Sequence, residues 1–279
     1  MRFQHAIKTL CRVLCVNRST YYKHFSDTPS ERAIENQKLR SDILTIYSAS
    51  KKRLGAYKIR QRLIVEYGKK VSVGRVYRLM KSMILPKMST SKPVSTFSKN
   101  EQGECKNLLE QKFNPQKPNL VWASDITFIK VAGRFVYLCV IIDLYARKVI
   151  AYKTSANIDT KLVIDTFSQA YKKRKYPKDV MFHSDRGSNY TSKEFRNTLD
   201  NVGFIQSFSA KGHPYDNAVV ESFFKYLKKE ELNRNTFHSF NELDLALFEY
   251  IEGFYNCRRP HSANEFLSPD EKENLFFSS

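Results

Sequence analysis

Three apolar segments that follow one another from residue 120 limit the possible folds of this chain most strongly. Residues 121–131, 134–143 and 148–153 are rich in β-branched and aromatic side chains, which favour strands. The third is reached through a tight turn over 143–148, so little chain separates one segment from the next. The sequence therefore predicts an antiparallel meander, the start of an α/β domain.

The segments after this meander alternate between helical and strand patterns. The predicted elements are, in order, a helix over 158–173, a strand over 179–183, a helix over 192–201, a strand over 204–208, a loop over 209–217 and helices over 218–232 and 240–254. Strands that precede an alternation of helix and strand favour a mixed sheet flanked by helices.

The basic residues are concentrated in the first 110 positions. Residues 1–110 carry 23 Lys and Arg against 8 Asp and Glu, whereas residues 111–279 carry 24 against 20. An excess of this size predicts a polyanionic partner, most simply nucleic acid. General solubility is an alternative explanation. An anionic membrane is a weaker one, because no basic amphipathic segment with a Trp/Phe face is present.

Residues 1–28 have the pattern of a helix-turn-helix unit. Ile7, Leu10 and Leu14 form a helical stripe, and Asn17 is a good N-cap for a second helix that opens with Arg18. In such units the second helix presents its first side chains to the major groove of DNA. A helical hairpin in any small domain has a similar pattern.

A second helical unit is predicted over residues 29–85. Helices are expected over 31–48, over 54–67 with Gly68 as its stop, and over 73–84 with Ser72 as its cap. The last helix divides into an apolar side and a basic side: Val73, Val76, Met80 and Met83 on one, and Arg75, Arg78 and Lys81 on the other. Arg18, Arg75 and Arg78 are the predicted DNA contacts, although a basic side can also be a solvated surface. Residues 86–119 hold four prolines and little periodicity, and predict a linker.

Membrane and secreted classes fit the sequence poorly. The longest apolar run, residues 135–142, has eight residues where a spanning helix needs about 20. The first residues lack a signal-peptide pattern, and five cysteines are too few for a disulfide framework. We expect a soluble protein of the cytoplasm, associated with the nucleoid.

Three carboxylates occur where burial makes them costly. Asp125 lies in the middle of an apolar strand, Asp185 ends a short apolar run, and Glu221 falls in the first turn of a helix. Taken singly, each has a structural explanation: a bond to backbone amides, a turn start, or a favourable helix N-terminus. Taken together, they form an oxygen-only donor set of the kind that binds Mg²⁺ or Mn²⁺, and two such ions can promote phosphoryl transfer.

The spacing and the flanking strings carry a family resemblance. Fifty-nine residues separate Asp125 from Asp185, and 35 separate Asp185 from Glu221. With WASDITFI, HSDRGSNYTS, GHPYDNAVVESFF and YNCRRPHSANEFLSP in this order, the chain resembles the downstream-frame (OrfB) transposases of the IS-three family of bacterial insertion sequences, which are related to retroviral integrases.

This resemblance implies an RNase H-like fold with a five-stranded mixed sheet over 120–279, and it makes the three carboxylates metal ligands for two Mg²⁺ or Mn²⁺ ions. It implies a DNA transposase in which water and then a 3′-hydroxyl attack DNA phosphodiesters. The expected partners are the terminal inverted repeats of the element, target DNA, further copies of the chain, and an upstream-frame (OrfA) protein, present as a partner or as a fusion.

Several further residues are candidates for roles near this set. Lys225 and Lys228 lie four and seven positions after Glu221 on one stripe of a helix, so we expect them to hold the DNA end, Lys228 above all. Ordinary helix-surface cations are the alternative. Structural roles are expected for the remaining candidates: Asp143 in the hairpin, His183 in the core, Asp216 as a helix cap, and Cys11 and Cys15 in the core.

Two other functions remain open from the sequence. The chain could be a catalytically inactive, sequence-specific DNA-binding regulator, or a plain RNase H-like nuclease that cleaves without joining.

Overall fold

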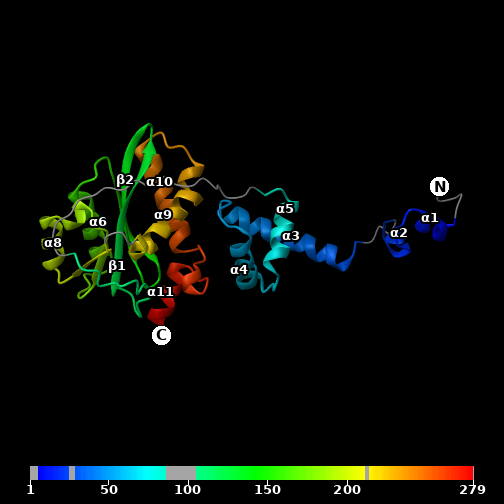
Figure 1. Ribbon diagram of the computed structural model, residues 1–279, viewed down its shortest axis with the longest axis horizontal. Coiled ribbons are helices and arrows are strands. Elements are labelled where there is room, and N and C mark those ends of the chain that lie inside the picture. The colour runs from blue at the N-terminus through cyan, green and yellow to red at the C-terminus, as the bar shows by residue number, and fades with distance from the viewer. Residues whose placement is uncertain (1–5, 25–28, 86–104, 211–213, 279) are drawn as a thin grey trace. The chain divides into compact units, whose positions relative to one another are not determined.

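The computed structural model describes residues 6–24, 29–85, 105–210 and 214–278, which fall into two compact units (Figure 1). Unit 1 comprises residues 1–86 and unit 2 residues 87–279, and each is described by itself. Within the described ranges, no helix combines the length and the apolar character that crossing a bilayer would require.

The first helical pair of unit 1 matches the prediction for residues 6–24. Helix α1 spans Ile7–Val13 and α2 spans Arg18–His24. The Asn17 side chain accepts a hydrogen bond from the Ser19 amide at 3.2 Å, as expected of an N-cap. Cys11 is buried as predicted, but the prediction for Cys15 was wrong. Cys15 has a positive φ of 50° in the turn after α1, and its side chain is exposed.

The remaining helices of unit 1 are α3 (Glu31–Ala49), α4 (Ala56–Tyr67) and α5 (Val73–Ser82). Gly68 ends α4 in the left-handed conformation, with φ of 62°, and the Ser72 hydroxyl accepts from the Arg75 amide to cap α5. The helices bury one apolar side each, chiefly Leu39, Ile43, Ile59, Leu63, Val76 and Leu79. In α5 the buried residue of the second turn is therefore Leu79, whereas we expected Met80.

Unit 2 is built on a five-stranded mixed sheet, as predicted. The strands are β1 (Val121–Val131), β2 (Arg134–Asp143), β3 (Lys148–Ser155), β4 (Met181–Ser184) and β5 (Ile205–Phe208), in the spatial order β3-β2-β1-β4-β5. The first three form the expected antiparallel meander, and β4 and β5 run parallel to β1.

Helices cover both faces of this sheet (Figure 1). The helices α6 (Thr160–Lys173), α8 (Lys193–Asp200) and the short α7 (Ser188–Thr191) lie on one side, and α9 (Ala218–Glu230) and α10 (Phe240–Tyr250) lie on the other. α10 continues into a π-helical segment, Ile251–Asn256, and α11 spans Pro269–Ser278. Among the described residues of the unit there are also 3₁₀ turns at Pro214–Asn217, Leu232–Arg234 and Ser262–Asn264. The sequence had not predicted α7 or α11.

The core on the α6 side is largely aromatic. Trp122, Phe167, Phe182, Phe195 and Phe204 are buried together, with ring centroids of neighbouring pairs 5.2–6.3 Å apart. This packing holds β1 and β4, the two strands that lead to the predicted aspartates.

The predicted linker extends too far toward the C-terminus. Its first part, 86–104, lies outside the described residues, but residues 105–119 belong to unit 2 and are bonded to other parts of it. The Phe208 amide donates to the Lys106 carbonyl at 3.0 Å, and the Ser207 hydroxyl accepts from the amides of Leu108 and Leu109. Arg147 donates to the Phe113 carbonyl. Residues 105–119 therefore run along unit 2 and extend its structure.

The C-terminal YN-x-x-R-x-H segment closes the outer edge of the sheet. The Tyr255 hydroxyl donates to the Arg147 carbonyl at 3.0 Å. The Asn256 amide accepts from the Val149 N–H at 3.0 Å and donates to the Val149 carbonyl at 2.9 Å. A side chain thus completes the backbone pairing of the edge strand β3, which would otherwise be open to another strand.

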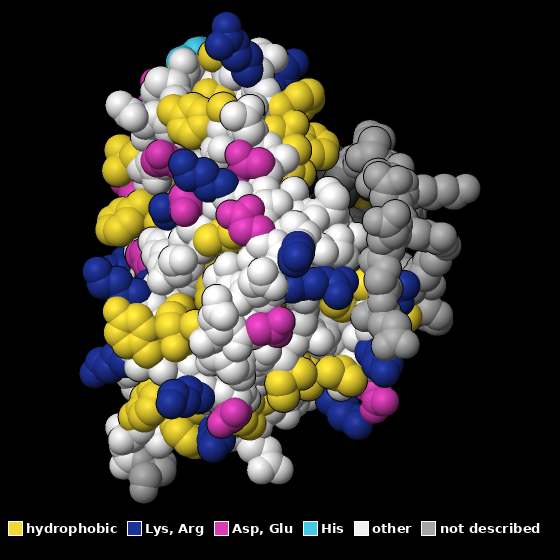
Figure 2. Space-filling model, turned by 90° about the vertical axis from the view of Figure 1, so that its left-hand side faces the viewer, with side chains coloured by type: hydrophobic (Ala, Val, Ile, Leu, Met, Phe, Trp, Pro, Cys, Tyr) yellow, Lys and Arg dark blue, Asp and Glu magenta, His cyan; other side chains and the backbone are white. Residues whose placement is uncertain are grey.

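Charge on unit 2 is mixed. On the face shown in Figure 2, Lys and Arg side chains are interspersed with Asp and Glu and with apolar patches. This agrees with the near balance of 24 basic and 20 acidic residues over 111–279.

Candidate active site

The two predicted aspartates lie at matching positions on neighbouring parallel strands. β1 and β4 pair from Val121 with Met181 to Ala123 with His183. Asp125 and Asp185 each come two residues after that last pair, and so on the same side of their strands. Parallel neighbours are about 4.8 Å apart, and the ends of parallel strands are where ligand sites form in α/β sheets. The register therefore brings together two carboxylates that are 60 positions apart in the sequence.

Asp125 is partly buried in the strand β1. Its carboxylate accepts a hydrogen bond from the Ile126 amide at 2.7 Å. Burial, and then the negative charges of Asp185 and Glu221, raise the pKa of Asp125 to about 8, against a smaller opposing effect of the Ile126 amide and Lys228. This carboxyl group is thus held as a neutral acid near neutral pH unless a cation offsets the repulsion.

Asp185 follows β4, and its carboxylate is bonded to the loop that comes directly after it. Its Oδ1 accepts from the Gly187 amide at 2.9 Å, and a Cβ at position 187 would lie 3.0 Å from that oxygen. Only glycine allows this close approach without displacing the carboxylate. Burial raises the pKa of Asp185 as well, and the Gly187 amide opposes the shift.

Glu221 lies outside the sheet, in the first turn of the helix α9. Asn217, at the start of that helix, donates from Nδ2 to the Ser124 carbonyl at 3.2 Å, which ties α9 to the residue before Asp125. Burial raises the pKa of Glu221 although its side chain is mostly exposed. Glu221 is close enough to Asp125 for its charge to contribute to the raised pKa there.

These three side chains are near one another but do not form a closed cage. Within the described ranges, no three His, Cys, Asp or Glu side chains have the geometry of a ready metal site. The donor set nevertheless fits a hard divalent cation, because it offers carboxylate oxygens whose mutual repulsion a positive ion would relieve. The Oδ1 atom of Asn217 is also buried beside this site without a hydrogen-bond partner in the described structure.

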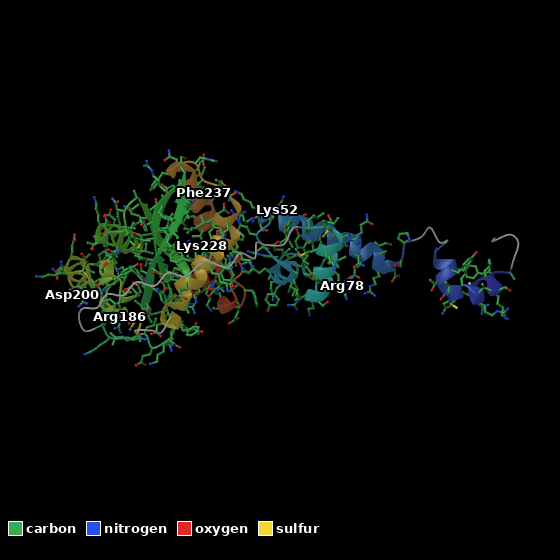
Figure 3. All side chains as sticks on the ribbon, turned by 45° about the horizontal axis from the view of Figure 1, so that its top comes forward. Lys52, Arg78, Arg186, Asp200, Lys228 and Phe237 are labelled. Atoms are coloured by element: carbon green, nitrogen blue, oxygen red, sulfur yellow. The ribbon has the colours of Figure 1, made fainter. Side chains whose placement is uncertain are left out.

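Of the two predicted lysines, only Lys228 reaches the carboxylates. Lys228 is half-buried on α9 beside the sheet (Figure 3), and the charge of Asp125 acts on it. Burial lowers the pKa of Lys228, an effect that Asp125 opposes. Its ammonium nitrogen lies 5.2 Å from the centre of the Phe128 ring. Lys225 is exposed on the same helix.

The three predicted arginines of unit 1 differ in their surroundings. Arg18 is exposed at the start of α2, and Arg78 is exposed on α5. Arg75 instead donates to both carboxylate oxygens of Glu35, at 3.0 and 2.7 Å, and to the side chain of Asn36. The bond from Arg75 also lowers the pKa of Glu35. Arg75 thus links α5 to α3, whereas Arg78 faces solvent.

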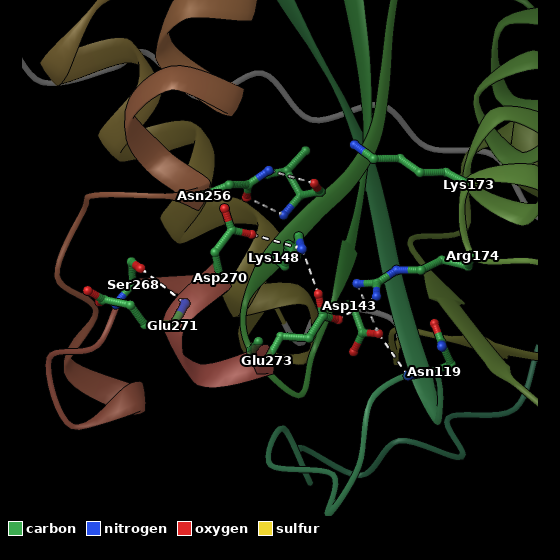
Figure 4. A network of polar contacts seen from close by, with 12 residues as sticks. Asn119, Asp143, Lys148, Lys173, Arg174, Asn256, Ser268, Asp270, Glu271 and Glu273 are labelled. Atoms are coloured by element: carbon green, nitrogen blue, oxygen red, sulfur yellow. Dashed lines mark hydrogen bonds and ion pairs between the residues drawn. The ribbon is translucent and has the colours of Figure 1, made fainter. Parts of the chain in front are cut away.

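Asp143 and His183 have the structural surroundings that we expected. Asp143 is fully buried and accepts from the amides of Asn119 and Tyr145 at 2.8 and 3.0 Å, with Arg174 at 3.6 Å (Figure 4). His183 is also fully buried, with Nδ1 2.9 Å from the Ser207 hydroxyl. Burial lowers the pKa of His183 to about 4, so it is neutral at physiological pH.

Asp216 does not have the predicted role of a helix cap. The N-cap of α9 is Asn217, and no side chain caps that helix. The Asp216 carboxylate accepts instead from Asn107 at 2.8 Å, Gln111 at 3.0 Å and the Ala210 amide at 2.8 Å. It fastens residues 105–111 to the loop before α9, a long-range contact that the sequence pattern could not show.

Tyr190 supports the site and was missed in the sequence. Its hydroxyl lies 2.8 Å from that of Ser124, next to Asp125, and its ring is buried on α7. Burial raises the pKa of Tyr190 far above its usual value, so it stays protonated. The only sequence signal was an aromatic residue inside the polar turn SDRGSNYTS.

Comparison with known proteins places this arrangement in a family. Residues 115–214 and 203–269 match models described as "Integrase core domain", and residues 34–87 match an "HTH-like domain". The chain is 36% identical over 275 residues to "Transposase InsF for insertion sequence IS3A" of Escherichia coli (strain K12), covering 97% of this chain and 95% of that protein. The chain belongs to the IS-three family of insertion-sequence transposases.

A second member gives the same result. The "Transposase for insertion sequence element IS904" of Lactococcus lactis subsp. lactis (strain IL1403) is 36% identical over 246 residues, which cover 88% of this chain and 97% of the relative. The HTLV-2 integrase catalytic core domain in complex with magnesium aligns with 57% of this chain and 98% of its own, at 19% identity and a TM-score of 0.42.

This membership confirms three predictions from the sequence: the family resemblance, the integrase-type core and the transposase function. This member of the IS-three family is a DNA transposase, an enzyme of the polynucleotidyl transferase class that binds DNA. The helix-turn-helix expected over 1–28 lies outside the residues that the HTH-like model matches, and it stays a prediction.

Proposed function

We propose that Asp125, Asp185 and Glu221 are the catalytic, metal-binding residues with which this transposase cleaves the ends of its element and joins them to target DNA. The observation that carries the proposal is the matched register of Asp125 and Asp185 on β1 and β4, with Glu221 close enough to raise the pKa of Asp125 further. Such repulsion is costly in a site that serves only stability, and it suits a site that receives cations.

The cofactor we propose is Mg²⁺ or Mn²⁺, with two ions in each site. A donor set made of three carboxylates favours such hard cations. When bound, the ions would stabilise the attacking and leaving oxygens of an in-line displacement at phosphorus.

The residues of the chain itself would orient the DNA and the ligands. The Gly187 amide and the Ile126 amide fix the two aspartate carboxylates. Asn217 and the β1–α9 contact place Glu221 opposite them. Lys228, half-buried beside Asp125, offers one cation to a phosphate of the DNA end, while Lys225 on the exposed stripe contacts the same strand further out.

In unit 1 we assign DNA contacts to the exposed arginines. Arg78 on α5 and Arg18 on α2 face solvent on helices with the helix-turn-helix pattern. Arg75 was predicted to contact DNA too, but its bonds to Glu35 and Asn36 favour a role in holding α5 for that contact.

Partners beyond DNA are also part of the proposal. Pairing two element ends requires at least two active sites, so we propose that the protein acts as a homo-oligomer on the terminal inverted repeats and target DNA. We also propose an upstream-frame (OrfA) protein as a partner, either separate or fused to this chain. The proposed place of action is the bacterial nucleoid in the cytoplasm.

The proposal is tested with a labelled DNA end of the element, offered to the full chain with Mg²⁺, with Mn²⁺ and with a chelator. We expect metal-dependent cleavage followed by a joined product. A protein that binds the end without cleaving it would be a regulator, and one that cleaves without joining would be a nuclease. Either result would contradict the transposase reaction proposed for these residues.

Lys228→Ala sharpens the test. We expect joining at low salt to fall about tenfold relative to the wild type, with a deficit that narrows as salt rises and an unchanged melting temperature, because one phosphate contact is lost. Lys225→Ala, on the exposed part of the same helix, should have a smaller effect. Joining by Lys228→Ala that equals wild-type joining at low salt would mean that Lys228 is an ordinary helix-surface cation.

A further inference from the structure

Two phenylalanines are exposed on the hairpin that carries Asp125. Phe128 on β1 is 45% exposed and Phe135 on β2 is 54% exposed. Their ring centroids are 5.3 Å apart with planes at 82°, so the edge of one ring meets the face of the other. Exposed apolar residues are common on protein surfaces, and this pair is of interest because it lies on the hairpin that carries Asp125.

These rings are not part of the buried aromatic cluster of unit 2. Ile126 and Tyr137 lie on the same side of the hairpin and pack against the buried cluster around Trp122 and Phe182. Phe128 and Phe135 continue that side of the sheet beyond the cluster, where the rings meet solvent. Packing of the core therefore does not explain why two aromatic rings lie at this place.

Their position relates them to the proposed active site. Phe128 is three residues after Asp125, about 10 Å along the strand, and because side chains alternate it lies on the opposite side of β1 from the Asp125 carboxylate. The pairing of β1 with β4 ends at Ala123, so this stretch of β1 has lost its neighbour on that side. Lys228 reaches into the space: its nitrogen lies 5.2 Å from the Phe128 ring, and the charge of Asp125 acts on it.

The charges around the rings favour a negatively charged ligand. Lys130 is directly opposite Phe135 in the register, and Arg134 begins β2; both are exposed. Residues 126–142 contain no Asp or Glu. The hairpin tip is also held in place, because the Ala132 amide donates to the Phe237 carbonyl at 3.0 Å. Aromatic faces flanked by cations on a rigid support are the chemistry of sites for unpaired nucleotides.

We propose that Phe128, packed against Phe135, is a stacking platform for one unpaired nucleobase of the DNA strand that enters the active site. The proposal rests on the function proposed above. Lys228 would hold the phosphate between that base and the carboxylates. At about 3.4 Å per nucleotide, 10 Å places the base within roughly three nucleotides of the scissile phosphate. Because every base has a π-face, the platform would not read sequence.

The experiment uses the full chain and a DNA end of the element that carries the fluorescent base 2-aminopurine at one of the three positions on either side of the cleavage point. Binding is measured in a chelator, so that the DNA stays intact. We expect a change in fluorescence on binding at one of these positions, which reports stacking on an aromatic ring. Phe128→Leu should abolish this change and Phe128→Trp should keep it. Leucine preserves the bulk but not the π-face.

Affinity and fold supply the controls. Phe128→Leu should weaken binding of the DNA end about fivefold or more. Phe277→Leu, which removes an exposed phenylalanine on α11, should alter neither binding nor fluorescence. Thermal unfolding checks that each variant folds. If Phe128→Leu does not fold, Phe135→Leu replaces it, with the same loss of signal expected.

The outcomes separate this proposal from the proposed function. If the wild-type protein cleaves and joins the DNA with Mg²⁺ but Phe128→Leu keeps the fluorescence change, stacking is overturned and the function stands. If Phe128→Leu leaves the fluorescence change intact and instead alters the oligomeric mass in light scattering, the pair is a contact between copies of the chain, and the proposal is again overturned. If the wild type binds the DNA without cleaving it, the proposed function fails first.

Discussion

The two units use charge in opposite ways. Unit 1 displays cations such as Arg18 and Arg78 to solvent, and its residues 1–86 hold 19 basic and 5 acidic side chains. Unit 2 is nearly balanced in charge, but several of its charged side chains are buried. Asp125 is partly buried beside Asp185, and Glu230 and Arg259 are almost fully inaccessible, at 0% and 2% exposure.

This difference corresponds to two kinds of physical effect. Exposed cations act on a polyanion as a sum of weak, screened attractions, so no single one is decisive. Buried charges act strongly and at short range, and they shift the pKa of their neighbours. We therefore expect substitutions in unit 2 to have large, specific effects and substitutions in unit 1 to have small ones that depend on salt.

The largest expected effect is the loss of chemistry in the carboxylate variants. Asp125→Asn, Asp185→Asn and Glu221→Gln should each abolish cleavage and joining, because each removes a proposed metal ligand. Binding of the DNA end, measured by mobility shift, should change little, since unit 1 is untouched. More than about a tenth of wild-type joining in any of these variants would exclude that residue as a ligand.

The next effect concerns the buried ion pair between Glu230, the last residue of α9, and Arg259. Two Arg259 nitrogens each donate to Glu230 at 2.8 Å, and the Tyr250 hydroxyl donates to the same carboxylate at 2.9 Å. Arg259→Ala leaves a buried carboxylate unpaired, which typically costs about 3–5 kcal/mol. Denaturant unfolding measures this loss.

Arg258→Ala, next to it and exposed, is the matched control and should cost about 0.5 kcal/mol or less. Replacing Glu230 and Arg259 together by Leu and Met should recover much of the lost stability, because the unpaired charge is then gone. Equal losses in the Arg259 and Arg258 variants would show that the pair contributes nothing specific.

A further effect is expected in the pH dependence of the metal-free protein. The pKa of Asp125 is about 8 in the folded chain and about 3.9 in an unfolded one. The folded state therefore binds this proton more tightly than the unfolded state does. Protonation of Asp125 stabilises the fold fully at pH values below about 3.9, and this stabilisation is lost as pH rises toward and through 8. In a chelator, the melting temperature of the wild type should fall more steeply between pH 5 and pH 9 than that of Asp125→Asn.

Each kcal/mol of this difference corresponds to about 2–4 °C in a unit of this size. Asp200→Asn, an exposed carboxylate on α8, should follow the wild-type curve (Figure 3). Parallel curves for wild type and Asp125→Asn would contradict the burial and repulsion that we assign to Asp125.

The smallest effects should come from unit 1. Residues 1–95 alone should bind DNA with a log–log salt slope of roughly −4 or steeper, and in the full chain Arg78→Ala should reduce the slope by about 0.9. Arg75→Ala should leave the slope nearly unchanged and lower the melting temperature slightly, because Arg75 bonds to Glu35. Equal slope changes in both variants would restore Arg75 as a direct DNA contact.

The fold of unit 2 was largely readable from the sequence because its signals are local. Apolar alternation defined β1 to β3, and amphipathic periodicity defined α6, α9 and α10 to within a few residues at each end. The short α7 and the terminal α11 were missed, because four residues give no period and the pattern around α11 is weakly amphipathic. Residues 105–119 were misread as linker, since their bonds to Ser207, Phe208 and Arg147 involve residues far away in the chain.

The sequence by itself determined the family, the charge asymmetry and the identity of the three carboxylates, because residue type, spacing and net charge are properties of the chain in any conformation. Tertiary structure alone decided which groups meet. The β1–β4 register placed Asp125 beside Asp185, the bond from Asn217 to Ser124 set α9 against them, and Glu35 drew Arg75 away from solvent. Electrostatic repulsion, desolvation and hydrogen bonds depend on distances of a few ångströms, which exist only after folding.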